Sequence, residues 1–178
     1  GYSHLNKVYM AKDILDNNMT SSTASCKWSK LYNAIDQANA VLKYAPSSAI
    51  PMKDEDRAWA IGQASFARAY CYFWAVRIWG DVPLNTEPIE SVSQKETYPA
   101  RSPESAVYAL IEKDIQTAVD NSGALGTNKY LATKDAVNML KAEYALWMYS
   151  VEKAGEGYLS MASEALESIG VKSGDSRL

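Results

Sequence analysis

Apolar positions along most of this chain recur at intervals of three and four residues, the spacing that gathers side chains on one face of an α-helix. The first such stretch begins at Lys27 and reaches the proline-containing segment 46–51. Its apolar face is formed by Leu31, Ile35, Ala38 and Leu42. Further helices are predicted over about 54–79, from 102 to Gly123, and over about 133–151 and 158–169. No segment alternates polar and apolar residues as a half-buried strand does, so the pattern predicts an all-α protein.

Short links between these helices favour antiparallel hairpins, the first helix with the second and the third with the fourth. Small residues at the expected contacts are typical of tetratricopeptide-like (TPR-like) stacks, although the strict TPR signature does not recur. We therefore predict an all-α, TPR-like stack of antiparallel helical hairpins over residues 27–170. A leading loop region, 1–26, precedes it, and 171–178 form the tail of an apparently truncated chain.

The longest predicted helix, 54–79, carries a stripe of aromatic residues beside a stripe of small ones. Such a helix is expected to pack closely on two sides, and Gly80 and Pro83 are expected to end it. We expect the large side chains of this helix and of the fourth helix to be largely buried: Phe66, Tyr70, Phe73, Trp74, Leu140, Tyr144 and Trp147.

Composition and charge exclude several classes of protein. The 178 residues include 18 Lys and Arg against 21 Asp and Glu, for a formal net charge of −3. This balance argues against binding to nucleic acid or to an anionic membrane surface. No apolar run approaches the roughly 20 residues that a membrane-spanning helix needs. The 12 Tyr and 5 Trp against 2 Phe favour hydrogen-bonded packing, or surfaces that stack on sugars and partners.

The sequence offers little chemistry for catalysis. The single histidine, His4, lies near the start, so neither a catalytic triad nor a histidine metal site is expected in the helical body. Cys26 and Cys71 are too far apart for a CxxC motif, and Cys71 is predicted to be buried. There is no phosphate-binding glycine motif, so no cofactor is expected. Three sets of carboxylates are interpreted as exposed helix surface rather than as a glycosidase pair: Asp54-Glu55-Asp56, Glu112 with Asp114, and Glu164 with Glu167.

The longest helix carries two arginines, Arg68 and Arg77, and Asp81 follows just past its end. We predict that these arginines take part in a partly buried ion pair with an acidic residue or in hydrogen bonds from helix to loop. The Asp81 carboxylate faces the negative end of the helix dipole. We expect it to act as a structural clasp of the Gly-Asp-Val-Pro turn, compensated by Arg77 or by backbone N–H groups of the turn, with no ligand contact.

Residues 64–84, with the sequence ASFARAYCYFWAVRIWGDVPL, resemble the aromatic-helix signature of the SusD/RagB family. Ala67 departs from the usual Leu of that signature, and Gln63 from a common Glu. Segments 28–42, 101–115 and 130–146 are similar to three further helices of the family in the same order, so the resemblance covers about residues 27–170. The residues that match the aromatic-helix signature, interpreted as structural, include Phe66, Arg68, Tyr72, Phe73, Arg77, Gly80, Asp81 and Pro83.

The resemblance implies a nutrient-binding lipoprotein of the Bacteroidetes outer membrane, without catalytic activity. Family members are surface-exposed, carry a lipid anchor, and cover a SusC-like TonB-dependent transporter that imports oligosaccharides or, in some members, peptides. The resemblance therefore implies such a transporter and a nutrient, most often an oligosaccharide, as partners. This chain would be the N-terminal helical portion, and it would contact the membrane only through an anchor that the sequence does not contain.

The resemblance also points to the stretch before the Trp28 helix, because the family builds much of its ligand surface from loops. Candidate ligand-binding residues there are Tyr9, Asp13, Asn17 and Asn18, which either meet sugar hydroxyls and ring faces or form an ordinary loop. Two functions stay open: a binding subunit of a nutrient importer, and a helical scaffold or protein-interaction module with no small-molecule ligand of its own. A detached hydrolase domain is a distant third.

Overall fold

The computed structural model describes residue 20 and residues 27–91 and 99–171. Five α-helices form this part of the chain, which confirms the all-α prediction. They are α2 (Ser29–Tyr44), α3 (Asp54–Trp79), α4 (Glu104–Asp120), α5 (Lys134–Ser150) and α6 (Gly157–Ser168), with a 3₁₀ turn, η2 (Ser122–Ala124), after α4. The sequence pattern does not predict the two short strands, β1 (Val82–Pro83) and β2 (Arg101–Ser102). They pair antiparallel, with Val82 opposite Ser102 and Pro83 opposite Arg101.

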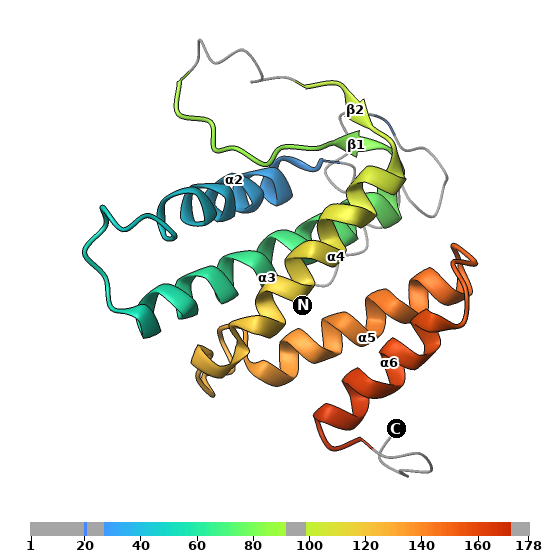
Figure 1. Cartoon of the computed structure of the whole chain (residues 1–178). Coiled ribbons are helices and arrows are strands. Elements are labelled where there is room, and N and C mark those ends of the chain that lie inside the picture. The colour runs from blue at the N-terminus through green and yellow to red at the C-terminus, as the bar shows by residue number, and fades with distance from the viewer. Residues whose placement is uncertain (1–19, 21–26, 92–98, 172–178) are drawn as a thin grey trace, which may run out of the picture.

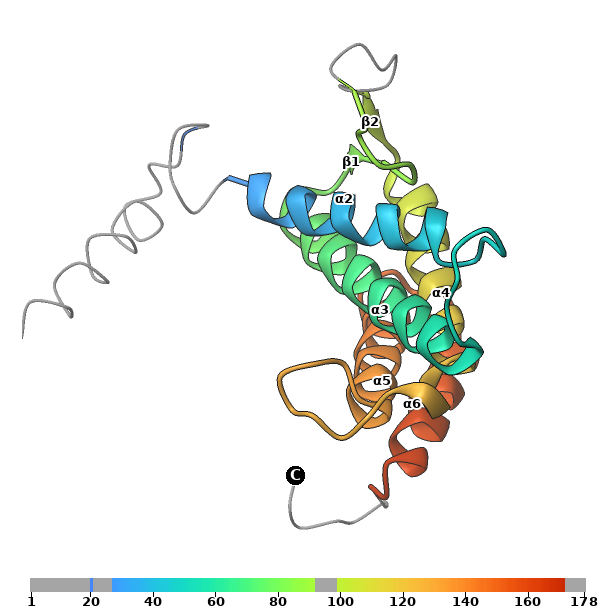
Figure 2. The ribbon, with the colours of Figure 1, turned by 90° about the vertical axis from the view of Figure 1, so that its left-hand side faces the viewer.

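Helix α3 lies at the centre of the stack, with α2 and α4 antiparallel to it, while α5 and α6 form a second hairpin (Figures 1 and 2). The predicted pairing of the third and fourth helices is wrong, because α4 packs mainly on α3 and α5 packs mainly on α6. A small residue allows α3 to approach the end of α4. A Cβ added at Gly62 would lie 3.1 Å from Leu125 Cδ2 and 3.3 Å from Asn121 Cβ.

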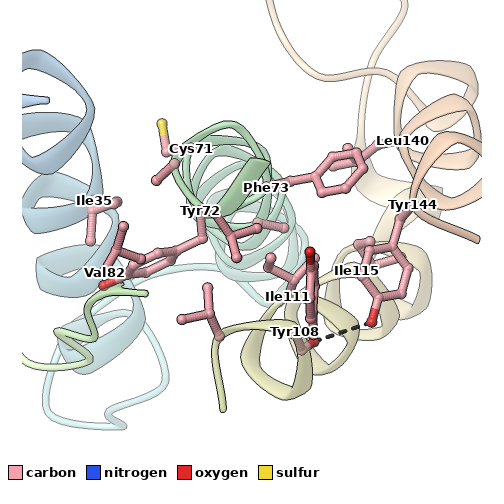
Figure 3. Close-up of a cluster of buried hydrophobic side chains, with 14 of the residues drawn as sticks. Ile35, Cys71, Tyr72, Phe73, Val82, Tyr108, Ile111, Ile115, Leu140 and Tyr144 are labelled. Carbon is pink, nitrogen blue, oxygen red and sulfur yellow. Dashed lines mark hydrogen bonds between the residues drawn. The ribbon is translucent and has the colours of Figure 1, made fainter. Parts of the chain in front are cut away.

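The main core lies on both sides of α3. Tyr72 points from α3 toward Ile35 and Val82, and Phe73 points toward Leu140 and Tyr144 (Figure 3). The Phe73 and Tyr144 rings meet edge to face with centroids 5.8 Å apart, an arrangement that aromatic quadrupoles favour. Two adjacent residues of α3 therefore hold α2 on one side and α5 on the other.

The burial expectation is confirmed for Phe73, Leu140 and Tyr144, while Phe66 and Trp147 are partly buried. It is wrong for Tyr70 and Trp74, which are 42% and 41% exposed. The reason lies in the packing of α3, whose neighbours cover most of its circumference but leave one sector open. Tyr70 and Trp74 lie in that sector, and Tyr70 contacts Phe66 one turn before it and Trp74 one turn after it, with ring centroids 6.0 and 6.3 Å apart.

The ends of the helices follow local rules. Thr133 caps α5 by accepting a hydrogen bond from the Ala136 N–H at 3.2 Å, as its side chain allows. Gly80 ends α3 with φ of +67°, a conformation in which an L side chain is strained. Within the described residues, none of the helices combines the length and apolarity that a membrane span requires.

Candidate functional site

The ligand-binding residues expected from sequence, Tyr9, Asp13, Asn17 and Asn18, lie outside the described residues. The structure instead places a groove of about 610 Å³ beside the beginning of α2. One wall is a face of α2, and the other is the segment that follows β1 and runs alongside α2 (Figure 1). Its lining residues are Trp28, Ser29, Tyr32, Asn33, Ile35, Asp36, Asn39, Pro83, Asn85, Ile89 and Pro99.

Local sequence explains the α2 wall. Ser29, Tyr32, Asn33 and Asp36 are spaced three and four residues apart, so an α-helix brings them to one face. Trp28 stands immediately before the helix and extends this face with an indole ring. The wall thus combines an aromatic surface with an amide and a carboxylate.

Hydrogen bonds hold the opposite wall against α2. The Tyr32 hydroxyl donates to the Pro83 carbonyl at 2.5 Å, and the Ile89 N–H donates to Asp36 Oδ1 at 2.7 Å. Tyr72 anchors the middle of the segment, because its hydroxyl accepts from the Asn85 N–H at 2.7 Å and donates to the Asn85 carbonyl at 2.9 Å. Burial raises the pKa of Tyr72 to about 12, so this hydroxyl keeps its proton at neutral pH.

Beneath the groove lies a buried polar network that joins three helices. Arg68 of α3 donates from Nε and Nη2 to the two carboxylate oxygens of Asp114 in α4, at 2.7 and 2.8 Å. Arg68 also donates from Nη1 to Asn39 Oδ1 of α2 at 2.8 Å. The Asn39 amide then donates to the carbonyls of Asn85 and Glu87, at 3.0 and 3.3 Å. The network therefore connects the centre of the stack to the groove wall.

This network settles two expectations. Arg68 does form an ion pair, and the pair is fully rather than partly buried, since Arg68 is 7% and Asp114 2% exposed. The interpretation of Asp114 as exposed helix surface is wrong, because its position on α4 faces the arginine of α3. The set at 54–56 and the pair of Glu164 with Glu167 are exposed, as expected.

The aromatic end of the groove is fixed by ring contacts. The Trp28 ring meets the rings of Tyr32 and Trp79 edge to face, with centroids 5.6 and 5.8 Å apart. The Arg101 guanidinium lies over the Trp28 ring, 5.3 Å from its centroid. Trp28 remains partly exposed, so the indole is held in place while part of its surface is open to a ligand.

Several polar atoms of the groove remain available. Among the described residues, no hydrogen bond engages the side-chain amides of Asn33 and Asn85 or the Oδ2 atom of Asp36. Amide donors and acceptors together with a carboxylate oxygen suit a ligand that carries many hydroxyl groups. Convergent polar groups beside an aromatic ring are typical of small-molecule sites. These groups can bind a ligand, and among the described residues that line the groove none is paired as a nucleophile with a general base.

Sequence reasoning missed Trp28, Asn33, Asp36 and Asn85 as site residues. The three-residue spacing of Asn33 and Asp36, with Trp28 shortly before them, was visible in the sequence and could have indicated a surface of mixed aromatic and polar character. Asn85 had no such signal, because its place opposite α2 depends on how the chain turns after α3.

In the Gly-Asp-Val-Pro turn, the Asp81 carboxylate has a partner other than the two that were expected. Asp81 Oδ1 accepts a hydrogen bond from the Glu104 N–H at the beginning of α4, at 3.1 Å. The carboxylate therefore lies at the positive end of the α4 dipole, which offsets its place beyond the negative end of α3. Arg77, expected as a possible partner, instead pairs with Glu143 of α5 at 2.7 Å and lies over the Phe73 ring.

A second hollow, of about 400 Å³, is lined by residues of α4, α5 and α6. Its carboxylate, Glu112, accepts hydrogen bonds from the hydroxyls of Tyr144 and Tyr158 at 3.3 and 3.1 Å. Burial raises the pKa of Tyr144, which therefore remains a hydrogen-bond donor. Glu112 thus has a structural role in holding α6 to the stack. In the described part of the chain, no three His, Cys, Asp or Glu residues converge as metal ligands would.

Comparisons with known proteins point to one family. A SusD-like family model, described as "Starch-binding associating with outer membrane", matches residues 2–145. The SusD-like protein P38 of Formosa agariphila is 31% identical over 152 residues, which cover 84% of this chain and 29% of that protein. The chain therefore spans less than a third of the length of this relative.

Solved structures show the same likeness. NanU of B. fragilis is 28% identical with a TM-score of 0.70, over 80% of this chain and 28% of that one. A crystal structure with xylogluco-oligosaccharide is 27% identical with a TM-score of 0.72, over 88% of this chain and 31% of that one. A SusD superfamily protein from Bacteroides fragilis is 25% identical with a TM-score of 0.73, over 89% of this chain and 33% of that one, so the order and packing of the helices are those of SusD-like proteins.

Proposed function

Because this chain belongs to the SusD-like family, we propose that it is the helical part of a non-catalytic glycan-binding subunit that takes up nutrients at the bacterial outer membrane. In this proposal, a SusC-like TonB-dependent transporter is the partner, and a lipid anchor holds the subunit at the cell surface. The glycan would be an oligosaccharide, as in the similar structure with xylogluco-oligosaccharide.

The observation that carries the proposal is the groove along α2. It offers an indole ring at one end, Trp28, and free amides on both walls, Asn33 and Asn85. A sugar ring has apolar faces that pack on an aromatic ring and hydroxyls that exchange hydrogen bonds with amides. Hydrogen bonds from Tyr32 and Asn39 connect the groove walls, and Tyr72 of α3 holds the wall that follows β1, so the site is largely formed before a ligand arrives.

Calorimetric titration of the purified chain with malto-, laminari- and xylogluco-oligosaccharides tests this proposal. We expect at least one of them to bind, and Trp28→Ala to weaken that binding by about tenfold or more, equal to about 1.4 kcal/mol. Trp74→Ala is the matched control, because Trp74 is an exposed tryptophan outside the groove. Circular dichroism verifies that both variants fold. Absence of binding, or equal affinity of the Trp28→Ala variant, would contradict the proposal.

A protein-interaction role is the second candidate. The open sector of α3 supports it, because Trp59, Tyr70 and Trp74 are each about 40% exposed there. Large aromatic residues at a surface are enriched in protein–protein contacts. Under this alternative, none of the oligosaccharides would bind, and substitution of these aromatic residues would leave the stability of the chain nearly unchanged.

A further inference from the structure

The groove along α2 has an uneven distribution of charge. Among its lining residues, Asp36 alone carries a charged side chain at neutral pH. One carboxylate oxygen, Oδ1, is engaged by the Ile89 N–H, while Oδ2 has no hydrogen bond from the described residues. A ligand in the groove therefore meets a carboxylate oxygen that can accept a proton donor but repels a negative charge.

The cations near the groove lie outside its lining. Arg68 is paired with Asp114 beneath it. Arg101 does not line the groove, and its guanidinium covers the Trp28 ring at the aromatic end, 5.3 Å from the ring centroid. Lys27 and Lys30 flank Trp28 in the sequence but line neither wall.

Farther along α2, Lys43 contacts two glutamates of the opposite wall. Lys43 donates to Glu90 at 2.9 Å and lies 3.9 Å from Glu87. One ammonium group thus faces two carboxylates, and both glutamates belong to the chain segment that forms the opposite wall. Two carboxylates and one ammonium group therefore border the groove wall at this end.

We propose that the groove selects neutral oligosaccharides over anionic ones, such as those built from uronic acids, and that Asp36 is the residue that selects. This inference rests on the proposed glycan-binding function. Oδ2 accepts a hydrogen bond from a sugar hydroxyl, and a bond to a charged acceptor is stronger than one between neutral groups. A sugar carboxylate at the same place would instead be repelled. Two like charges about 5 Å apart in water-like surroundings correspond to about a fourfold loss of affinity, and to more where the pair is partly shielded from water.

Matched pairs of ligands test the selection. Cello-, laminari- and maltohexaose are each compared with the same hexasaccharide oxidised at its primary hydroxyls to carboxylates. We expect the parent chain to bind the neutral member at least about fourfold more tightly, with a ratio that falls as salt is added. Asp36→Asn keeps the volume of the side chain and an acceptor for the Ile89 N–H. It is expected to bring the ratio close to one, mainly by raising affinity for the oxidised member.

A control variant and the possible outcomes separate this inference from the proposed function. Glu164→Gln removes one carboxylate from α6, outside the groove, and should leave the ratio unchanged. Equal binding of both members, or a ratio that Asp36→Asn does not alter, overturns the selection by Asp36 while glycan binding stands. If neither member of any pair binds while xylogluco-oligosaccharides do, the inference fails and the proposed function stands. If xylogluco-oligosaccharides do not bind either, the two fail together.

Discussion

The buried ion pair between Arg68 and Asp114 gives the most direct test of how this stack is held together. Asp114→Asn keeps the volume of the side chain but removes its charge, which leaves the Arg68 guanidinium 7% exposed with no anion beside it. Removing one partner of a buried pair typically costs about 3–5 kcal/mol, because the remaining charge is neither hydrated nor neutralised. For a protein of this size, we expect the melting temperature to fall by about 6–20 °C.

The matched control is Glu143→Gln at the Arg77 pair. Its nitrogen-to-oxygen distance is also 2.7 Å, but the side chain of Glu143 is 52% exposed. Water screens an exposed pair, so this variant should lose no more than about 1 kcal/mol of stability. Both variants replace a carboxylate by an amide, and they differ in how deeply the ion pair is buried.

A second variant, Arg68→Met with Asp114→Leu, removes both charges. Apolar replacement of a whole buried pair is often neutral or stabilising. Here Asn39 Oδ1 loses its donor, which costs about 1–3 kcal/mol. We expect the double variant to be more stable than Asp114→Asn in urea titrations followed by circular dichroism. If Asp114→Asn were no more harmful than Glu143→Gln, burial would not decide the strength of this pair, and the reasoning would be wrong.

Three further predictions concern the turn after α3 and the buried tyrosines. Asp81→Ala removes the side-chain acceptor at the beginning of α4 and should lower the free energy of unfolding by about 1 kcal/mol in urea titrations, with oligosaccharide affinity unchanged. Gly80→Ala should cost about 1–3 kcal/mol because φ is +67° there, whereas Gly123→Ala, with no atom within 4 Å of the added Cβ, should be nearly neutral in thermal melts. Burial raises the pKa of Tyr72 and of Tyr108 to about 12, so the folded state holds these protons more tightly than the unfolded state does. The stability they contribute is therefore full below about pH 10 and lost as the pH rises toward 12, and a free energy of unfolding that is constant from pH 9 to 11.5 would contradict this.

The sequence alone predicted the helices and several of their ends. Apolar spacing of three and four residues depends only on neighbours along the chain, so the pattern placed Phe73 and Tyr144 in the core. The cap at Thr133 and the end of α3 at Gly80 are local in the same sense, since each depends on the conformation of a few adjacent residues. The motif around Arg68 and Asp81 also indicated the family, which the comparisons confirm.

Tertiary structure alone decided which polar residues meet. Arg68 reaches Asn39 across 29 residues and Asp114 across 46, and Asn39 reaches Asn85 across 46. Periodicity identifies the face of a helix on which a residue lies, but it does not identify the helix that covers that face. That is why Asp114, two residues from the exposed Glu112, was expected at the surface, and why Trp74 was expected in the core. The groove has the same origin, because its two walls come together only when the chain after α3 folds back along α2.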